Sequence, residues 1–328
     1  MARSTQKRGA GVVKLVALVL FAALLGLGLL DSPPSAAAPS ASTPISACGT
    51  TINSAGNYKL AGNLAASGAT CITITANNVS IDLGGHTISG NASSSTSMFG
   101  ITDGGNTLSE IAILNGTVTG FNVDLALKAT NSATIDHVKL SGAVTSLSSG
   151  DGDGLEVACC STLANVIAIN NQRRGIDANG CCFTIVNTTA TNNGDVGIVA
   201  GGCCSTVTNS KATGNGGDGI DATGCCNSIV SCSATGNVGD GVYASSSNQS
   251  NQDNLVTNGK FTKNGNNGVE LDENGLITAT SATGNHTDGV SLICPGNAVL
   301  VKALHNSGAN LAEDTSAGPC TNVNNRAP

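Results

Sequence analysis

Residues 161–226 consist of three consecutive segments of equal length: STLANVIAINNQRRGIDANGCC (161–182), FTIVNTTATNNGDVGIVAGGCC (183–204) and STVTNSKATGNGGDGIDATGCC (205–226). Each segment ends in a Cys-Cys pair, and a fourth pair, Cys159-Cys160, precedes them, so the pairs recur every 22 residues. An internal period of this size is typical of solenoids, in which each unit buries its apolar face against its neighbours. The repeat therefore predicts a stack of coils.

Several positions keep their chemistry in these segments and in a fourth, 227–248, that lacks the Cys pair. The third position is Leu163, Ile185, Val207 and Ile229; the fifth is Asn165, Asn187, Asn209 and Ser231; the eleventh is Asn171, Asn193, Asn215 and Asn237. Apolar positions two apart, with Asn or Gly at the breaks, predict short strands joined by tight bends. Stacked about 4.8 Å apart, the side chains of the third position would form an inward aliphatic ladder and those of the fifth a buried amide ladder. The repeated Gly of the fifteenth position (Gly175, Gly197, Gly219 and Gly241) would supply turn conformations.

The segment TGNGGDGIDATGCC (213–226) resembles the repeats of right-handed parallel β-helix proteins, the superfamily with pectate-lyase-like and NosD-like members. The segment CITITANNVSIDLGGHTISG (71–90) is similar to the opening coils of secreted members. The resemblance implies an all-β, right-handed parallel β-helix of about ten coils of roughly 22 residues, covering 48–320. It implies little about activity, because lyases, hydrolases, epimerases, adhesins and non-catalytic proteins share the fold.

The N-terminal residues 1–38 have the pattern of a signal peptide. Basic residues precede an uncharged apolar run at 15–30, and small residues suitable for cleavage follow near Ala37 and Ala38. A signal anchor is the alternative, although this run is shorter than the roughly 20 residues that a membrane span needs. We therefore expect a secreted or cell-envelope protein without membrane contact after cleavage. A disordered leader at 39–47 and a disordered tail at 321–328 would flank the β-helix.

Thirteen cysteines in a chain expected to be secreted favour disulfides. Resemblance to secreted β-helix proteins implies that Cys48 and Cys71 close the first coil. We expect Cys294 and Cys320 to tie down the C-terminal end, where an exposed coil edge needs protection. With the four Cys-Cys pairs, these bridges would leave Cys232 free.

The Cys-Cys column, defined as Cys159, Cys160, Cys181, Cys182, Cys203, Cys204, Cys225 and Cys226, allows three interpretations. Adjacent residues of an extended segment point to opposite faces, and equivalent Cα atoms about 4.8 Å apart lie within disulfide range. Vertical bridges are therefore expected, for example Cys159 to Cys181 and Cys203 to Cys225. The alternatives are outward thiolates that bind a soft metal such as copper(I), and unpaired buried thiols that pack as small apolar groups.

Acidic side chains recur at two positions beside the repeated Gly. Stacking would place Glu156 beside Asp177 and Asp218 beside Asp240, close to the 5–5.5 Å between the carboxyl groups of retaining glycosidases. The candidate catalytic residues are therefore Asp218, Asp240, Asp221, Glu156 and Asp177, with Arg174 or its neighbour Arg173 as the cation. The alternatives are solvated acidic turns neutralised by these arginines, and acidic pairs that bind calcium. No other cofactor is predicted.

Composition and motifs narrow the function. The chain has no phosphate loop, dinucleotide fingerprint, H-E-x-x-H or G-x-S-x-G motif. A net charge of −7 argues against a nucleic-acid partner, and the absence of Trp leaves few aromatic platforms for sugar rings. We expect a non-catalytic protein that binds a polysaccharide or cell-surface glycan or serves as a structural element there; the alternative is a polysaccharide-active lyase, epimerase or glycoside hydrolase. An enzyme should have a cleft where two carboxylates and an arginine meet, whereas the expected binding protein should have a flat flank with its acids in water.

Overall fold

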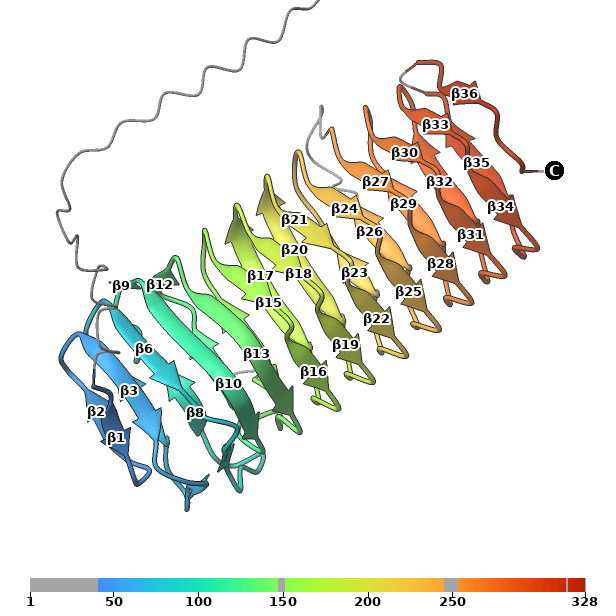
Figure 1. Cartoon of the computed structure of the whole chain (residues 1–328). Helices are drawn as coiled ribbons and strands as arrows, with labels where there is room; N and C mark the ends of the chain where they lie inside the picture. The colour runs from blue at the N-terminus through green and yellow to red at the C-terminus, as the bar shows by residue number, and fades with distance from the viewer. Residues whose placement is uncertain (1–40, 147–150, 245–252, 317, 328) are drawn as a thin grey trace, which may run out of the picture. The chain divides into compact units, whose positions relative to one another are not determined.

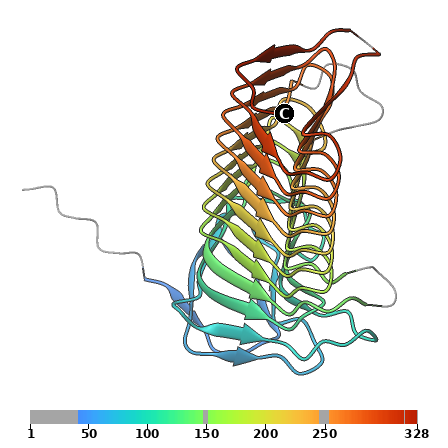
Figure 2. The same cartoon turned by 90° about the vertical axis from the view of Figure 1, so that its right-hand side faces the viewer.

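The computed structural model describes residues 41–146, 151–244, 253–316 and 318–327, so the predicted signal peptide lies outside the described residues. The described residues contain 36 strands, and all regular elements among them are strands. Successive coils stack in chain order from the N-terminal to the C-terminal coil (Figures 1 and 2). None of the described residues forms a helix long and apolar enough to span a membrane.

One parallel sheet takes one strand from each coil and contains twelve strands. These are β2 (Thr50–Ile52), β5 (Ile72–Ile74), β8 (Phe99–Thr102), β11 (Val123–Leu127), β14 (Leu155–Val157), β17 (Ile176–Cys181), β20 (Ile198–Cys203), β23 (Ile220–Asp221), β26 (Val242–Ala244), β29 (Val269–Leu271), β32 (Val290–Ile293) and β35 (Leu311–Asp314). The expected right-handed parallel β-helix is confirmed, with about twelve coils rather than ten. The described residues between 91 and 153, which precede the 22-residue repeat, also form coils that contribute the strands β8 and β11 to this sheet.

A second parallel sheet of 22 strands has two columns. The first column contains β1 (Thr43–Ile45), β3 (Gly56–Leu60), β6 (Val79–Asp82), β15 (Thr162–Ala164), β18 (Thr184–Val186), β21 (Thr206–Thr208), β24 (Ser228–Val230), β27 (Leu255–Thr257), β30 (Leu276–Thr278), β33 (Asn297–Val299) and β36 (Thr321–Val323). The second contains β4 (Leu64–Ala65), β7 (Thr87–Ser89), β16 (Ile167–Ile169), β19 (Thr189–Thr191), β22 (Lys211–Thr213), β25 (Ser233–Thr235), β28 (Lys260–Thr262), β31 (Ser281–Thr283) and β34 (Lys302–Leu304). The long strands β10 (Ile111–Thr119) and β13 (Thr134–Ser141) join the columns, and β9 (Leu108–Ser109) pairs with β12 (Thr130–Asn131).

The β-helix extends beyond the expected boundaries at both ends. Strand β1 lies within the expected leader 39–47 and pairs with β3, and β36 lies within the expected tail 321–328 and pairs with β33. The boundaries 48–320 are therefore too narrow. The additional strands have a physical reason: each end coil presents an unpaired strand edge, and a further strand satisfies its backbone N–H and C=O groups.

The third repeat position forms the aliphatic ladder that the sequence predicts. Leu163 pairs in register with Ile185, which pairs with Val207, which pairs with Ile229. All four side chains are buried. Stacking aliphatic side chains on one another in this way removes the apolar face of each coil from water.

The buried amide ladder lies at the eleventh position, not at the predicted fifth. Asn171, Asn193, Asn215 and Asn237 are buried, and each side chain donates from Nδ2 to the Oδ1 of the next at 2.9 to 3.0 Å. The ladder continues through Asn264, Asn285 and Asn306. By contrast, Asn187 and Asn209 are exposed, because the fifth position turns a corner with left-handed backbone angles (φ of 52° and 50°) that direct the side chain outward.

The repeated glycine is required for space rather than for turn geometry, which corrects the expectation from sequence. A Cβ atom on Gly197 would lie 2.5 Å from Nδ2 of Asn215, and one on Gly175 would lie 2.7 Å from Nδ2 of Asn193. Neither glycine has a positive φ. The Gly and Asn positions of neighbouring coils are therefore coupled, because the amide ladder occupies the volume that a side chain would need.

Three disulfides join neighbouring coils: Cys48–Cys71, Cys203–Cys225 and Cys294–Cys320, all three of which the sequence predicts. Disulfides are typical of extracellular and envelope proteins, which fold in oxidising compartments. The expected bridge from Cys159 to Cys181 is not formed, and the free cysteines are Cys159, Cys160, Cys181, Cys182, Cys204, Cys226 and Cys232.

The predicted alternation of inward and outward thiols is also wrong. The second cysteine of each pair has a φ near +60° and is exposed, while the first is half-buried at the surface. A left-handed residue breaks the extended geometry on which the alternation depends. Among the free cysteines of the described residues, only Cys232, which lies outside the Cys-Cys column, is buried.

Candidate functional site

Three adjoining hollows follow the outer face of the twelve-stranded sheet. The first, of about 430 Å³, is lined by Thr70, Thr73, Phe99, Thr102, Asp103, Gly104, Gly105, Ala126, Lys128, Asp151 and Glu156. The second, of about 250 Å³, shares Lys128 and Glu156 with it and adds Val157, Asp177 and Asn179. The third, of about 360 Å³, shares Asn179 and adds Arg174, Val199, Gly201, Gly202, Asp221, Thr223 and Gly224. We call these hollows together the groove; the expected flat flank is wrong.

Glu156 and Asp177 lie at the centre of the groove on neighbouring strands. They pair directly in register between β14 and β17, as the 22-residue period predicts. The Glu156 side chain is 2% exposed, and its Oε1 lies 2.5 Å from Nζ of Lys128. Burial raises the pKa of Glu156 to about 7 even though Lys128 acts in the opposite direction. This carboxyl group can therefore hold or release a proton near neutral pH.

Asp177 has a different setting. Its Oδ2 accepts a hydrogen bond of 2.8 Å from Arg174, whose Nε also lies 3.7 Å from Oδ2 of Asp195. The other carboxylate oxygen of Asp177, Oδ1, is buried and has no hydrogen-bond partner among the described residues. Asp177 is thus an ion-paired carboxylate whose second oxygen receives no hydrogen bond from the described residues.

A third carboxylate, Asp153, lies behind this pair. It is fully buried, and it accepts hydrogen bonds of 2.8 Å from the Arg173 side chain and from the backbone N–H of Arg174. One oxygen each of Asp153, Glu156 and Asp177 lies within 4.8 Å of the others, a spacing that a cation could bridge. Because Arg173, Arg174 and Lys128 already supply positive charge, we assign no calcium ion to this group.

The predicted pair Asp218 and Asp240 lies outside the groove lining and has a backbone role. Oδ1 of Asp218 accepts the N–H of Asp240, and Oδ1 of Asp240 accepts the N–H of Asn267, both at 2.6 Å. Asn267 does the same for Asp288 in the next coil. An oxygen acceptor at this repeat position therefore ties each coil to the next.

Of the predicted residues, the structure brings Glu156, Asp177 and Arg174 together. Asp221 lines the third hollow, where its Oδ1 accepts hydrogen bonds from the backbone N–H and the hydroxyl of Thr223. It is two strands from Asp177, because Val199 lies between them in the register, so about 10 Å separates their backbones.

Sequence reasoning missed Lys128. The residue follows β11, and Ala126 of that strand pairs with Glu156, which is 30 residues further along the chain. The 22-residue period does not hold over this coil, so no register could be assigned to Lys128 from the repeat. Its side chain is 62% exposed and lies against Glu156, which makes it the covering group of the buried carboxyl.

No protein-family model matches the chain, and no curated protein sequence matches it. Solved structures with a similar fold include the A-module of the mannuronan C-5 epimerase AlgE6 from Azotobacter vinelandii (TM-score 0.54, 18% identity, covering 79% of this chain and 69% of that chain). The A-module of AlgE4 from the same organism gives a TM-score of 0.52 at 19% identity, over 83% of this chain and 77% of that chain. The periplasmic alginate epimerase AlgG gives 0.56 at 14% identity, over 80% and 78%. At these identities the likeness extends to the fold, and the chain is a parallel β-helix protein with the fold of these polysaccharide epimerases.

Proposed function

We propose that the protein is a polysaccharide-active enzyme that binds a sugar chain along the groove and hydrolyses it with retention of configuration. Glu156 acts as the general acid and base, and Asp177 acts as the nucleophile. The observation that carries this proposal is the pair of carboxyl groups, adjacent in register, within a groove that also contains Arg174 and Lys128. The polysaccharide partner expected from the sequence is part of this proposal. The expected non-catalytic role is replaced by a catalytic one.

The groove suits a polymer. Its three hollows follow one another across neighbouring strands of a single sheet, so successive sugar units of one chain can occupy them in turn. The first hollow contains hydroxyl groups from Thr70, Thr73 and Thr102 and one aromatic ring, Phe99. Sugar recognition there depends mainly on hydrogen bonds. The fold likeness to mannuronan epimerases supports a polysaccharide as the substrate class.

The separation of the two carboxyl groups supports the retaining reaction. Oxygen atoms of Glu156 and Asp177 lie within 4.8 Å of one another. Retaining enzymes hold their two carboxyl groups about 5–5.5 Å apart, whereas inverting enzymes need about 6.5–9.5 Å to admit a water molecule. A C-5 epimerase exchanges a proton between opposite faces of the ring, and two groups side by side on one sheet suit that reaction less well.

The different settings of the two groups support their different roles. A buried carboxyl with a pKa of about 7 donates a proton to the glycosidic oxygen near neutral pH, and takes one from water in the second step. Asp177 supplies the carboxylate that attacks the sugar, and the hydrogen bond from Arg174 to Oδ2 fixes its position. Binding of the sugar moves the exposed Lys128 ammonium aside, which uncovers Glu156.

The test is an activity panel of uronic-acid and neutral polysaccharides, with new reducing ends as the readout and product configuration followed by NMR. We expect hydrolysis with retention, and a loss of about 10²–10⁴-fold in kcat for Glu156→Gln. Asp240→Asn is the matched control: burial also raises the pKa of Asp240 to about 7, but this residue does not line the groove, so its kcat should be unchanged.

Three results would overturn the proposal. The first is binding of a polysaccharide without turnover, which would favour the non-catalytic function. The second is an unsaturated or C-5-epimerised product that Glu156→Gln abolishes, which would assign a lyase or epimerase reaction to the groove. The third is equal loss of activity in Glu156→Gln and Asp240→Asn, because a structural effect would then explain both.

A further inference from the structure

The Cys-Cys column is divided into two halves in different covalent states. In the C-terminal half, Cys203 and Cys225 form a disulfide, which leaves the exposed thiols of Cys204 and Cys226. In the N-terminal half, all four thiols are free: Cys159, Cys160, Cys181 and Cys182. The same repeat therefore presents a bridged pair of coils and, directly before it, an unbridged pair.

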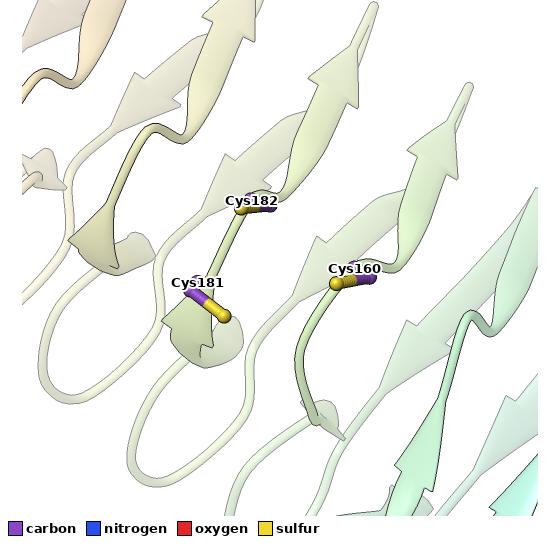
Figure 3. A group of neighbouring side chains, drawn as sticks. All are labelled: Cys160, Cys181 and Cys182. Atoms are coloured by element: carbon purple, nitrogen blue, oxygen red, sulfur yellow. The ribbon is translucent and has the colours of Figure 1, made fainter.

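The unbridged half gathers three sulfur atoms in a small volume. The Sγ atoms of Cys160, Cys181 and Cys182 lie within 4.8 Å of one another. Figure 3 shows that Cys160 lies on one coil and the other two on the next, with the Cys181 sulfur directed toward the Cys160 coil. Among the described residues, no other group of three or more sulfur atoms meets this spacing.

The backbone holds the three residues in place. Cys181 ends strand β17, and its carbonyl oxygen accepts a hydrogen bond of 2.8 Å from the N–H of Cys160. Cys160 and Cys182 have left-handed backbone angles, with φ of 61° and 59°, at equivalent corners of successive coils. The corners direct both side chains outward, where Cys160 and Cys182 are exposed and Cys181 is half-buried. All three residues are thus at least partly open to solvent.

The spacing fits a metal ion with three sulfur ligands. Metal–sulfur bonds of about 2.3 Å place the sulfur atoms of a trigonal site about 4 Å apart, which needs only small side-chain rotations from the spacing observed. Thiolate sulfur is a soft ligand and selects soft cations over calcium or magnesium. Three converging ligands from two coils suit trigonal coordination, while a structural zinc site usually has four.

Cysteine binds metal ions as the thiolate, so each sulfur that binds the cation releases its proton and the affinity should increase with pH.

We propose that Cys160, Cys181 and Cys182 form a three-sulfur site for a soft monovalent cation of the copper(I) class. The site lies at the corner after β17, and the proposal does not depend on the activity proposed for the groove. The neighbouring coils supply a control within the same chain. Cys204 and Cys226 occupy equivalent corners, but the third sulfur that the site needs is consumed there by the Cys203–Cys225 disulfide.

The test starts with the full chain, isolated without reductant, and mass spectrometric mapping of its thiols and disulfides. Copper(I) is then titrated in the absence of oxygen against a competing copper(I) chelator. We expect one tightly bound ion per chain, and three sulfur neighbours at about 2.3 Å in X-ray absorption. Cys160→Ser, Cys181→Ser and Cys182→Ser should each weaken binding at least about 100-fold, whereas Cys204→Ser and Cys226→Ser should leave it unchanged.

Three results would overturn the proposal. One is a disulfide that includes any of the three sulfur atoms in the protein as isolated, such as the Cys159–Cys181 bridge expected from sequence. Another is copper(I) binding that Cys182→Ser does not weaken. The last is an equal loss in Cys204→Ser, because the ion would then bind along the whole column rather than at one site.

Discussion

Glu156 and Asp177 pair directly in register on β14 and β17, yet their carboxyl groups have different electrostatic partners. Glu156 is buried beneath the side chain of Lys128, with which it forms an ion pair. Asp177 forms an ion pair with Arg174. Burial raises the pKa of Glu156 to about 7. A buried carboxyl group of this kind, next to a second carboxyl group with its own cation, is an arrangement suited to acid–base chemistry.

Replacing Lys128 with Met should raise the pKa of Glu156 above its value of about 7. Lys128 favours the ionised carboxylate by a hydrogen bond and by its charge, so its removal leaves the effect of burial unopposed. A ¹³C NMR titration of the Glu156 carboxyl measures this directly, and the alkaline limb of kcat against pH should move up by about one unit. Lys139→Met on β13, outside the groove, is the control; a pKa that stays at its original value in Lys128→Met would contradict the assigned ion pair.

Replacing Asp240 with Asn should stabilise the protein at pH 8 and have little effect near pH 4. Burial raises the pKa of Asp240 to about 7, so between about pH 4 and 7 the folded state keeps a proton that the unfolded state has lost, and stability falls as pH rises. Above pH 7 the buried charge costs roughly 2–4 kcal/mol. Asn retains the acceptor oxygen for the N–H of the next coil, as Asn267 does at the equivalent position.

Urea unfolding of Asp240→Asn at pH 4, 6 and 8 measures this effect. Asp314 provides the control, because the backbone N–H of Ser316 lowers its pKa, and Asp314→Asn should give no gain at pH 8. A gain for Asp240→Asn that is the same at all three pH values would show that the charge is not its cause.

Replacing Asn215 with Ala should destabilise the β-helix by about 2–4 kcal/mol. The side chain accepts hydrogen bonds from the backbone N–H and Nδ2 of Asn193, and it donates to Ala190 and Asn237. Truncation leaves these buried groups without partners. The corresponding change at the exposed Asn209 removes no buried bond and should cost about 1 kcal/mol, from the left-handed backbone alone. Equal losses in thermal unfolding would contradict the placement of the ladder at the eleventh position.

Removing the Cys203–Cys225 disulfide by a double change to Ser should lower the free energy of unfolding by about 3 kcal/mol, as expected for a closed loop of 22 residues. Cys204→Ser, one residue away and unbridged, should have little effect. Denaturant unfolding of the two variants in the absence of reductant measures the difference. A destabilisation of similar size in Cys204→Ser would show that packing at the corner, rather than the cross-link, stabilises these coils.

The successes and failures of the sequence predictions have a common cause. Residues separated by a whole coil were placed correctly, as with the ladder from Leu163 to Ile229 and the pair Glu156 and Asp177. Errors arose at corners. The fifth and eleventh positions both carry Asn, and only the backbone angle at each corner decides which side chain is buried.

The groove could not be predicted from the repeat, because it depends on a coil whose length differs from 22 residues. Lys128 reaches Glu156 from a coil of 30 residues, and the hollows arise from side chains of several coils together. The Asp residues before the repeated Gly looked equivalent to those after it, but their oxygens accept backbone N–H groups of the next coil.

The sequence by itself determined the stack of parallel coils and the register of residues one period apart, because hydrogen bonding between parallel strands requires a constant offset along the chain. Only the tertiary structure decided which amides are buried, which cysteines are bridged and which acids share the groove with Arg174. These outcomes depend on side-chain directions at the corners and on contacts between coils of unequal length, and neither is encoded in a fixed spacing.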